Sequence, residues 1–254
     1  MDLNGKTILL TGSSKGIGAA TAQALGAAGA NLIMHYGSDR AGAEAAGAEI
    51  PAERKHLIAA DVLQPGAVDR LWREALAWHG HVDVVVNNAA IMLWEGGVYD
   101  DDATWDRVWS STFQVNVFAP VRLLRNAVRH FRERGGGIII TVSSWSAQRG
   151  STNPDTIAYA ASKAAVRAAT QTIARGYAKD KILAYIVAPG VVHTQMSENF
   201  AATQGGPQAV TAGLAMGEWV PPSDIANLVA FLATGKCRHL SGATLDVNGA
   251  SYVR

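Results

Sequence analysis

The stretch TILLTGSSKGIG, residues 7–18, decides the fold, because it joins a short apolar run to a glycine-rich turn and leads into an alanine-rich segment. This order predicts a strand, a tight turn and a helix. Gly12, Gly16 and Gly18 allow the backbone to approach a pyrophosphate closely, and the next helix presents free N–H groups and the positive end of its dipole. A phosphate site is predicted, although the spacing departs from Gly-x-Gly-x-x-Gly and a purely structural turn is the alternative.

Six further apolar segments follow along the chain. We expect strands at 7–10, 31–35, 57–60, 82–86, 138–142, 182–187 and 243–247, separated mostly by helical stretches. This alternation predicts an α/β fold of the Rossmann type, a doubly wound parallel sheet of seven strands with helices on both faces. A chain of 254 residues, 48% of them hydrophobic, can bury one large core, so we expect a single domain over residues 1–254.

Composition excludes several classes of function. A net charge of +1, with no repeat or low-complexity tract, predicts a small-molecule partner and no nucleic acid. No apolar run is long enough to span a bilayer, and Met1 to Asn4 leave no room for a signal peptide, so we expect no membrane and a cytoplasmic protein. The single Cys237 excludes an internal disulfide, and the seven histidines lack the spacing of metal ligands, so no metal is expected.

A tyrosine and a lysine lie four residues apart in Tyr159-Ala-Ala-Ser-Lys163, which stacks them on one face of a predicted helix. A phenol with a pKa of about 10 is a poor acid or base at neutral pH, but a cation within a few Å favours phenolate and lowers that pKa. The pair therefore fits an acid–base catalyst. An ordinary exposed helix face is the alternative.

Together the two segments resemble the short-chain dehydrogenase/reductase family, whose glycine motif is Thr-Gly-x-x-x-Gly-x-Gly and whose catalytic motif is Tyr-x-x-x-Lys. Both motifs are intact, and the resemblance covers essentially the whole chain. Other family marks occur in family order: Asp61-Val62, Asn87-Asn88-Ala89-Ala90, Asn116, Ser143-Ser144, and Pro189-Gly190 followed by Thr194. The resemblance implies an NAD(P)(H)-dependent oxidoreductase that interconverts a carbonyl and a secondary alcohol, assembled as a homotetramer or a homodimer.

The resemblance also assigns catalytic roles to Asn116, Ser144, Tyr159 and Lys163. Tyr159 would donate a proton to the carbonyl oxygen as hydride arrives, or remove it in the oxidative direction. Ser144 would hydrogen-bond the same oxygen, and Lys163 would lower the tyrosine pKa and bind the nicotinamide ribose. Ser144 precedes Tyr159 by fifteen residues where about thirteen is commoner in the family, so Ser143 and Ser146 stay open as the catalytic hydroxyl.

Asn116 lies four residues before Pro120, and a proline in a helix lacks the N–H that would bond the carbonyl of that fourth preceding residue. We therefore expect a free carbonyl at Asn116, where the family holds a water that relays protons to the lysine. An ordinary proline kink is the alternative. The segment from Trp109 to Phe113 looks like about one extra helical turn ahead of Asn116, which would reshape the approach to it.

The residues expected to bind the dinucleotide follow from the same resemblance. They are Gly12, Ser14, Lys15, Gly16, Ile17, Gly18, Tyr36, Asp61, Val62, Asn88, Ala89, Tyr159, Lys163, Pro189, Gly190, Val192 and Thr194. Tyr36 occupies the position where an acid would favour NAD, while Asp39 and Ser38 read more simply as helix N-caps. Lys15 stands where many NADP-dependent members carry a basic residue, so NADP(H) is favoured and NAD(H) remains possible.

Substrate identity is not determined by the sequence. Residues 193–217 predict a mobile lid, and Trp94, Trp145 and Gln148 are expected near the reacting carbon. Arginines at 122, 125, 129 and 132 form a basic helix edge that would suit an acyl-carrier protein, so a 3-oxoacyl-(acyl-carrier-protein) reductase is one alternative function. A non-catalytic dinucleotide-binding regulator is the other.

Overall fold

Seven parallel strands form one sheet in the order β3-β2-β1-β4-β5-β6-β7 in the computed structural model, which describes residues 1–254. The strands are β1 (Thr7–Thr11), β2 (Asn31–Tyr36), β3 (Lys55–Ala59), β4 (Val84–Asn87), β5 (Gly137–Val142), β6 (Ile182–Pro189) and β7 (Thr244–Val247). All seven predicted strands are confirmed. The strand order reverses between β1 and β4, which pair with Leu9 beside Val85.

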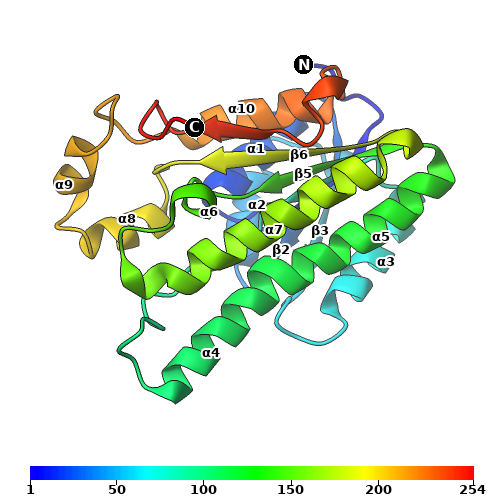
Figure 1. Cartoon of the computed structure of the whole chain (residues 1–254). Helices are drawn as coiled ribbons and strands as arrows, with labels where there is room; N and C mark the ends of the chain where they lie inside the picture. Colours follow the sequence, from blue (N-terminus) through cyan, green and yellow to red (C-terminus); the bar gives the residue numbers. More distant parts are fainter.

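Helices cover both faces of this sheet (Figure 1). They are α1 (Gly16–Ala27), α2 (Arg40–Ala46), α3 (Ala67–His79), α4 (Asp102–Phe113), α5 (Ala119–Arg134), α6 (Ser146–Arg149), α7 (Ile157–Gly176), α8 (Gln195–Ala202), α9 (Pro207–Ala212) and α10 (Pro222–Ala233), with a π-helical turn at Gln114–Phe118 and short 3-10 turns at 52–54, 154–156, 178–180 and 238–240. One buried core includes side chains of α1 and α10, and a second includes side chains of α3 and α5. The predicted doubly wound arrangement is confirmed. No helix combines the length and the apolar character needed to cross a membrane.

Successive side chains of the central strands point to opposite faces of the sheet and so belong to different cores. Ile8 and Leu10 of β1 pack into the core with α1 and α10, whereas Leu9 packs into the core with α3 and α5. Because both faces are covered, these strands are continuous apolar runs rather than alternating ones. The edge strand β3 begins at Lys55, two residues earlier than predicted. Its start was missed because its first residues are only partly buried and are not apolar.

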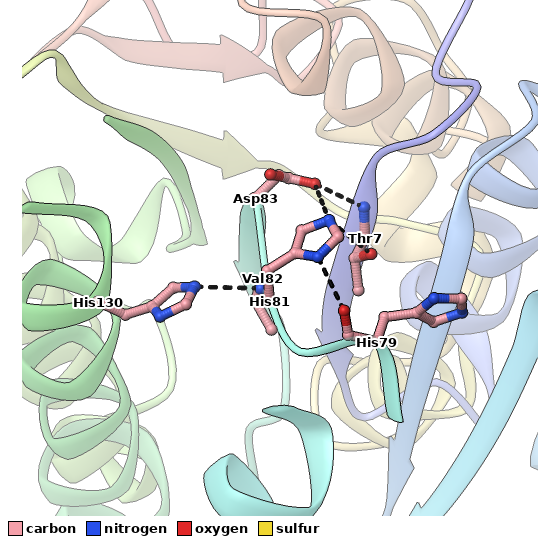
Figure 2. A network of polar contacts seen from close by, with 6 residues as sticks. All are labelled: Thr7, His79, His81, Val82, Asp83 and His130. Carbon is pink, nitrogen blue, oxygen red and sulfur yellow. Dashed lines mark hydrogen bonds and ion pairs between the residues drawn. The ribbon is translucent and has the colours of Figure 1, made fainter. Parts of the chain in front are cut away.

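Strands point toward the end of the sheet where α6, α8 and α9 lie (Figure 1). The opposite end carries a polar network around His81, which Figure 2 shows. The Asp83 carboxylate accepts from the Thr7 backbone N–H at 2.8 Å and lies 3.3 Å from His81 Nε2. His130 of α5 accepts the Val82 backbone N–H through Nε2 at 3.2 Å. The imidazole of His130 therefore links α5 to the start of β4.

This link makes stability depend on pH. Burial, assisted by Arg134, lowers the pKa of His130 below its ordinary value of 6.5. The neutral ring is also the form that can accept the Val82 N–H. The unfolded chain takes up the proton first, so the stabilisation is complete above about pH 6.5 and is lost as the pH falls toward the folded pKa. The free energy of unfolding should fall between pH 7 and pH 5 in the unmodified protein. In His130→Gln we expect this fall to be smaller by about 0.5–1.5 kcal/mol, the contribution of one hydrogen bond.

Urea unfolding across that pH range is the measurement, and His239→Gln, at an exposed histidine, is the matched control. Identical pH slopes for His130→Gln and the unmodified protein would show that the His130 link is not the titrating contact.

Candidate active site

The carboxyl ends of the strands open into one cleft of about 940 Å³. Every residue predicted to bind the dinucleotide lines this cleft except Tyr36. Three of the four predicted catalytic residues, Ser144, Tyr159 and Lys163, line it as well. The fourth, Asn116, lies behind the cleft wall and is buried. The fold thus brings together residues from both halves of the sheet.

The glycine turn after β1 lies in direct contact with the end of β4. Gly12 and Gly16 have φ angles of 68° and 55°, which L side chains rarely adopt. A Cβ at Gly18 would lie 1.8 Å from the Gly12 carbonyl oxygen, so no other residue fits there. Asn88 donates through Nδ2 to the carbonyl oxygens of Thr11 and Gly12, each at 3.0 Å. The turn is therefore held as a preformed backbone cradle at the N-terminus of α1, which suits a phosphate.

His35 at the end of β2 holds the same turn from the other side. Its Nδ1 accepts from the Gly12 N–H at 3.3 Å, so Nε2 carries the proton and donates to the Ala60 carbonyl oxygen at 2.8 Å. Burial lowers the pKa of His35 and keeps the ring neutral, as both contacts require. His35 was not predicted as a site residue, although a histidine at the end of an apolar strand indicates a polar role at that edge of the sheet.

Tyr36 is buried and does not line the cleft, whereas its neighbour His35 does, because side chains alternate along a strand. A contact of Tyr36 with the dinucleotide stays a prediction. Asp39 accepts from the Gly42 N–H at 2.9 Å, which confirms it as the N-cap of α2, and the suggestion of Ser38 for that position was wrong. Arg40 is bound to Glu44 at 2.8 Å.

Among the three candidate serines, only Ser144 is close enough to the Tyr159 phenol to oppose the rise in its pKa. Ser143 is turned toward α7, where its hydroxyl donates to the Lys163 carbonyl oxygen at 3.0 Å. Ser146 begins α6 and donates its backbone N–H to Ser144 Oγ at 3.1 Å. The geometry therefore favours Ser144, and Ser146 positions its hydroxyl through the backbone.

Tyr159 and Lys163 lie near each other without an acidic residue beside them. Burial raises the pKa of Tyr159 to about 12 and lowers the pKa of Lys163 to about 8. Lys163 Nζ donates to the Val142 carbonyl oxygen at 2.9 Å and lies 5.7 Å from the centre of the Tyr159 ring. Burial therefore dominates the pKa of Tyr159 while the lysine donates to Val142, and the expected lowering of the tyrosine pKa by Lys163 stays a prediction.

Asn116 lies in the π-helical turn that joins α4 to α5, just ahead of Pro120, and the free carbonyl expected at Asn116 stays a prediction. Its amide accepts from the Ile91 N–H at 2.9 Å and donates to the Ile91 carbonyl oxygen at 2.8 Å and to Ser162 Oγ at 3.0 Å. Ser162 Oγ donates in turn to the Tyr159 carbonyl oxygen at 2.7 Å. Asn116 therefore ties the loop after β4 to the helix that carries Tyr159.

Helices α8 and α9 lie in the segment 193–217 that was predicted as a lid, and Met196 and Phe200 of this segment line the cleft. The Phe200 ring lies 6.3 Å from the ring of Trp94 across the opening. Trp145 also lines the cleft, as predicted. Gln148 does not line the cleft, contrary to the prediction. Its side-chain amide is buried elsewhere and has no hydrogen-bond partner.

Comparison with known proteins agrees with this geometry. The family model described as enoyl-(acyl carrier protein) reductase matches residues 12–250. A 3beta-hydroxysteroid dehydrogenase of Eggerthella lenta is 36% identical, over 98% of this chain and 94% of that protein. Two solved structures align at 28% and 29% identity, with TM-scores of 0.86 and 0.87: a 3-ketoacyl-(acyl-carrier-protein) reductase of Brucella melitensis complexed with NADH and a short-chain dehydrogenase/reductase variant of Serratia marcescens. Each covers 99% of this chain, and the alignment takes in 100% of both.

The His35 contacts predict a stability effect. In His35→Leu the buried Gly12 N–H loses its acceptor and the Ala60 carbonyl loses its donor, which costs about 1–3 kcal/mol for each group left unpaired. We expect His35→Asn to recover part of that loss, because its side-chain oxygen can replace Nδ1 as the acceptor. Urea unfolding at pH 7.5 measures both variants. Equal stability of His35→Leu and the unmodified protein would show that the two His35 hydrogen bonds do not stabilise the turn.

Proposed function

The chain belongs to the short-chain dehydrogenase/reductase family, and we propose that its cleft interconverts a carbonyl and a secondary alcohol with Tyr159 as the general acid or base. The observation that carries the proposal is the Ser144 hydroxyl facing the Tyr159 phenol in the cleft beside the buried Lys163. A carbonyl oxygen placed between the two hydroxyl groups would accept a hydrogen bond from each.

The nicotinamide dinucleotide would supply or accept the hydride. The glycine turn fits its pyrophosphate, because Gly12, Gly16 and Gly18 place no side chain in front of the first turn of α1, whose N–H groups no side chain caps. Asp61, Val62, Asn88 and Ala89 line the middle of the cleft, and the segment from Pro189 to Thr194 lines its far wall. We propose the first group for the adenosine half and the second for the nicotinamide carboxamide.

The protein residues then divide the proton chemistry. With its pKa raised to about 12, Tyr159 is fully protonated at neutral pH and can donate to the developing alkoxide. Lys163, with a pKa of about 8, is mostly charged and stabilises the phenolate that remains. Asn116 holds the Tyr159 helix in place through Ser162, and we propose that its backbone carbonyl binds the water that returns the proton.

NADP(H) is the proposed cofactor in preference to NAD(H). Lys15 is exposed at the mouth of the glycine turn, lines the cleft and has no carboxylate partner among the ion pairs. Asp39 lines the same region, but its carboxylate already caps α2. An uncommitted cation without an uncommitted acid favours the extra phosphate.

A 3-oxoacyl-(acyl-carrier-protein) reductase is the second candidate. The Brucella melitensis relative carries that name, and Arg125 and Arg129 are exposed on α5. Two other arginines of this helix are neutralised, since Arg122 binds Asp69 at 2.7 Å and Arg132 lies 3.4 Å from Asp180. Of the four arginines predicted to dock an acyl-carrier protein, only Arg125 and Arg129 therefore remain unpaired.

We also propose a homotetramer or homodimer, as in the family. The rings of Trp105, Trp109 and Phe113 follow one another along α4, and Phe118 beside them is exposed. Trp105, Trp109 and Phe113 are partly exposed, and a partly exposed aromatic row that ends at Phe118 suits contact with a second copy. A cytoplasmic location likewise stays a prediction.

Tyr159→Phe tests the catalytic assignment. We expect kcat to fall about 100-fold or more, because the general acid is removed while the ring packing is kept. Oxidation of NADPH and NADH against ketones, aldehydes, ketoses, diketones and an acetoacetyl thioester is the assay. Cofactor binding, followed by nucleotide fluorescence, should be retained. A Tyr159→Phe protein that turns over normally would exclude this mechanism, and a regulator would be unaffected in its nucleotide response.

Lys15→Ala tests the cofactor proposal. Loss of one charge-assisted phosphate contact should weaken NADPH binding about tenfold or more and change NADH binding little. Arg40→Ala, at a cation already paired with Glu44, is the control. Equal weakening of the two nucleotides in a fluorescence titration would count against a phosphate contact at Lys15.

A further inference from the structure

The substrate half of the cleft contains one charged side chain besides the catalytic lysine. Charged residues lining the whole cleft are Lys15, Asp39, Asp61, Arg149 and Lys163. The first three come from the glycine turn and from the segments after β2 and β3, at the proposed adenosine end. Arg149 alone lies among the apolar and aromatic side chains near the lid, which include Trp94, Trp145, Met196, Phe200, Val210 and Leu214.

Arg149 is the last residue of α6, and its guanidinium carbon lies 4.6 Å from the centre of the Trp145 ring. Trp145 directly follows Ser144 and packs against the small core of Val191, Ala201 and Trp219. The stack therefore holds the cation close to the proposed catalytic serine. None of the seven ion pairs of the structure includes Arg149.

The segment that follows Arg149 is tied to the lid. Thr152 donates through Oγ1 to Gln204 Oε1 at 3.3 Å, and Asn153 donates through Nδ2 to Thr203 Oγ1 at 3.1 Å. Arg149 consequently lies at the rim where the end of α8 meets the loop after α6. A ligand that reaches Ser144 and Tyr159 under the lid passes this guanidinium.

We infer that the substrate is a keto acid, or the matching hydroxy acid, whose carboxylate binds Arg149 while its carbonyl lies at Ser144 and Tyr159. The planar guanidinium offers paired N–H donors that match a carboxylate, and the aromatic walls suit an apolar body between the two groups. This inference rests on the proposed function and deepens it by naming the substrate class. Because Arg149 is exposed and pairs with no carboxylate of the chain, its guanidinium is free to bind one from a ligand.

Matched pairs of compounds test the inference. Benzoylacetate, benzoylpropanoate and benzoylbutanoate, each beside its methyl ester, place a carboxylate or a neutral group at increasing distance from the same ketone. For the best-fitting acid we expect kcat/KM about tenfold or more above that of its ester. This preference should collapse in Arg149→Gln, persist in part in Arg149→Lys, and weaken as salt is raised. Arg73→Gln, at an exposed arginine outside the cleft, should keep the original ratio.

Two results would overturn the inference: equal kcat/KM for acids and esters at every chain length, or an Arg149→Gln protein that loses both activities equally and keeps the ratio. Titration of each acid and ester into the NADP⁺ complex, followed by tryptophan fluorescence, gives the same comparison without turnover. Binding of the acid that depends on Arg149 supports the inference, and equal binding of acid and ester refutes it. Absence of all turnover despite such binding would count against the proposed reaction alone.

Discussion

The rest of the cleft depends on one close contact, that of the glycine turn with the end of β4. Gly18 has no space for a side chain against Gly12, and Asn88 fastens the turn to the neighbouring strand end with two hydrogen bonds. Because β1 and β4 are where the strand order reverses, this contact joins the two halves of the sheet at the point where a ligand binds. His35 completes the fastening from the β2 side, so the backbone cradle is rigid before any ligand arrives.

A second constraint is the burial of an amine and a phenol with no carboxylate to neutralise them. Burial of Lys163 disfavours its charge and burial of Tyr159 disfavours phenolate, so each group is brought nearer to its neutral form. The backbone carbonyl of Val142 is what holds the lysine in place. A structural helix would replace such a pair with apolar residues at no loss of stability, so its retention favours a chemical role.

The predictability of these features follows from the physics of each segment. Strands buried on both faces, such as β1 and β5, appear as continuous apolar runs and were located from sequence, whereas the edge strand β3 begins with Lys55 and was located only in part. Motif residues at strand ends were placed correctly because parallel strands converge there. His35 was not expected at the cleft, because a strand reads the same in either phase when both faces are apolar. The buried amide of Gln148 depends on packing between α6 and α7, for which the sequence carries no signal.

The two halves of the cleft differ in what the fold demands of them. Residues proposed to bind the dinucleotide also fasten the glycine turn to the sheet, so we expect changes at Gly18 or Asn88 to disturb folding and binding together. The segments that line the other half, 145–153 and 195–214, contribute only the small core around Trp219 and otherwise rest on the sheet as short helices and loops. Their side chains can therefore vary without cost to the fold. Arg149, exposed and stacked on Trp145 in such a segment, is therefore free to serve recognition, as proposed for the carboxylate of the substrate.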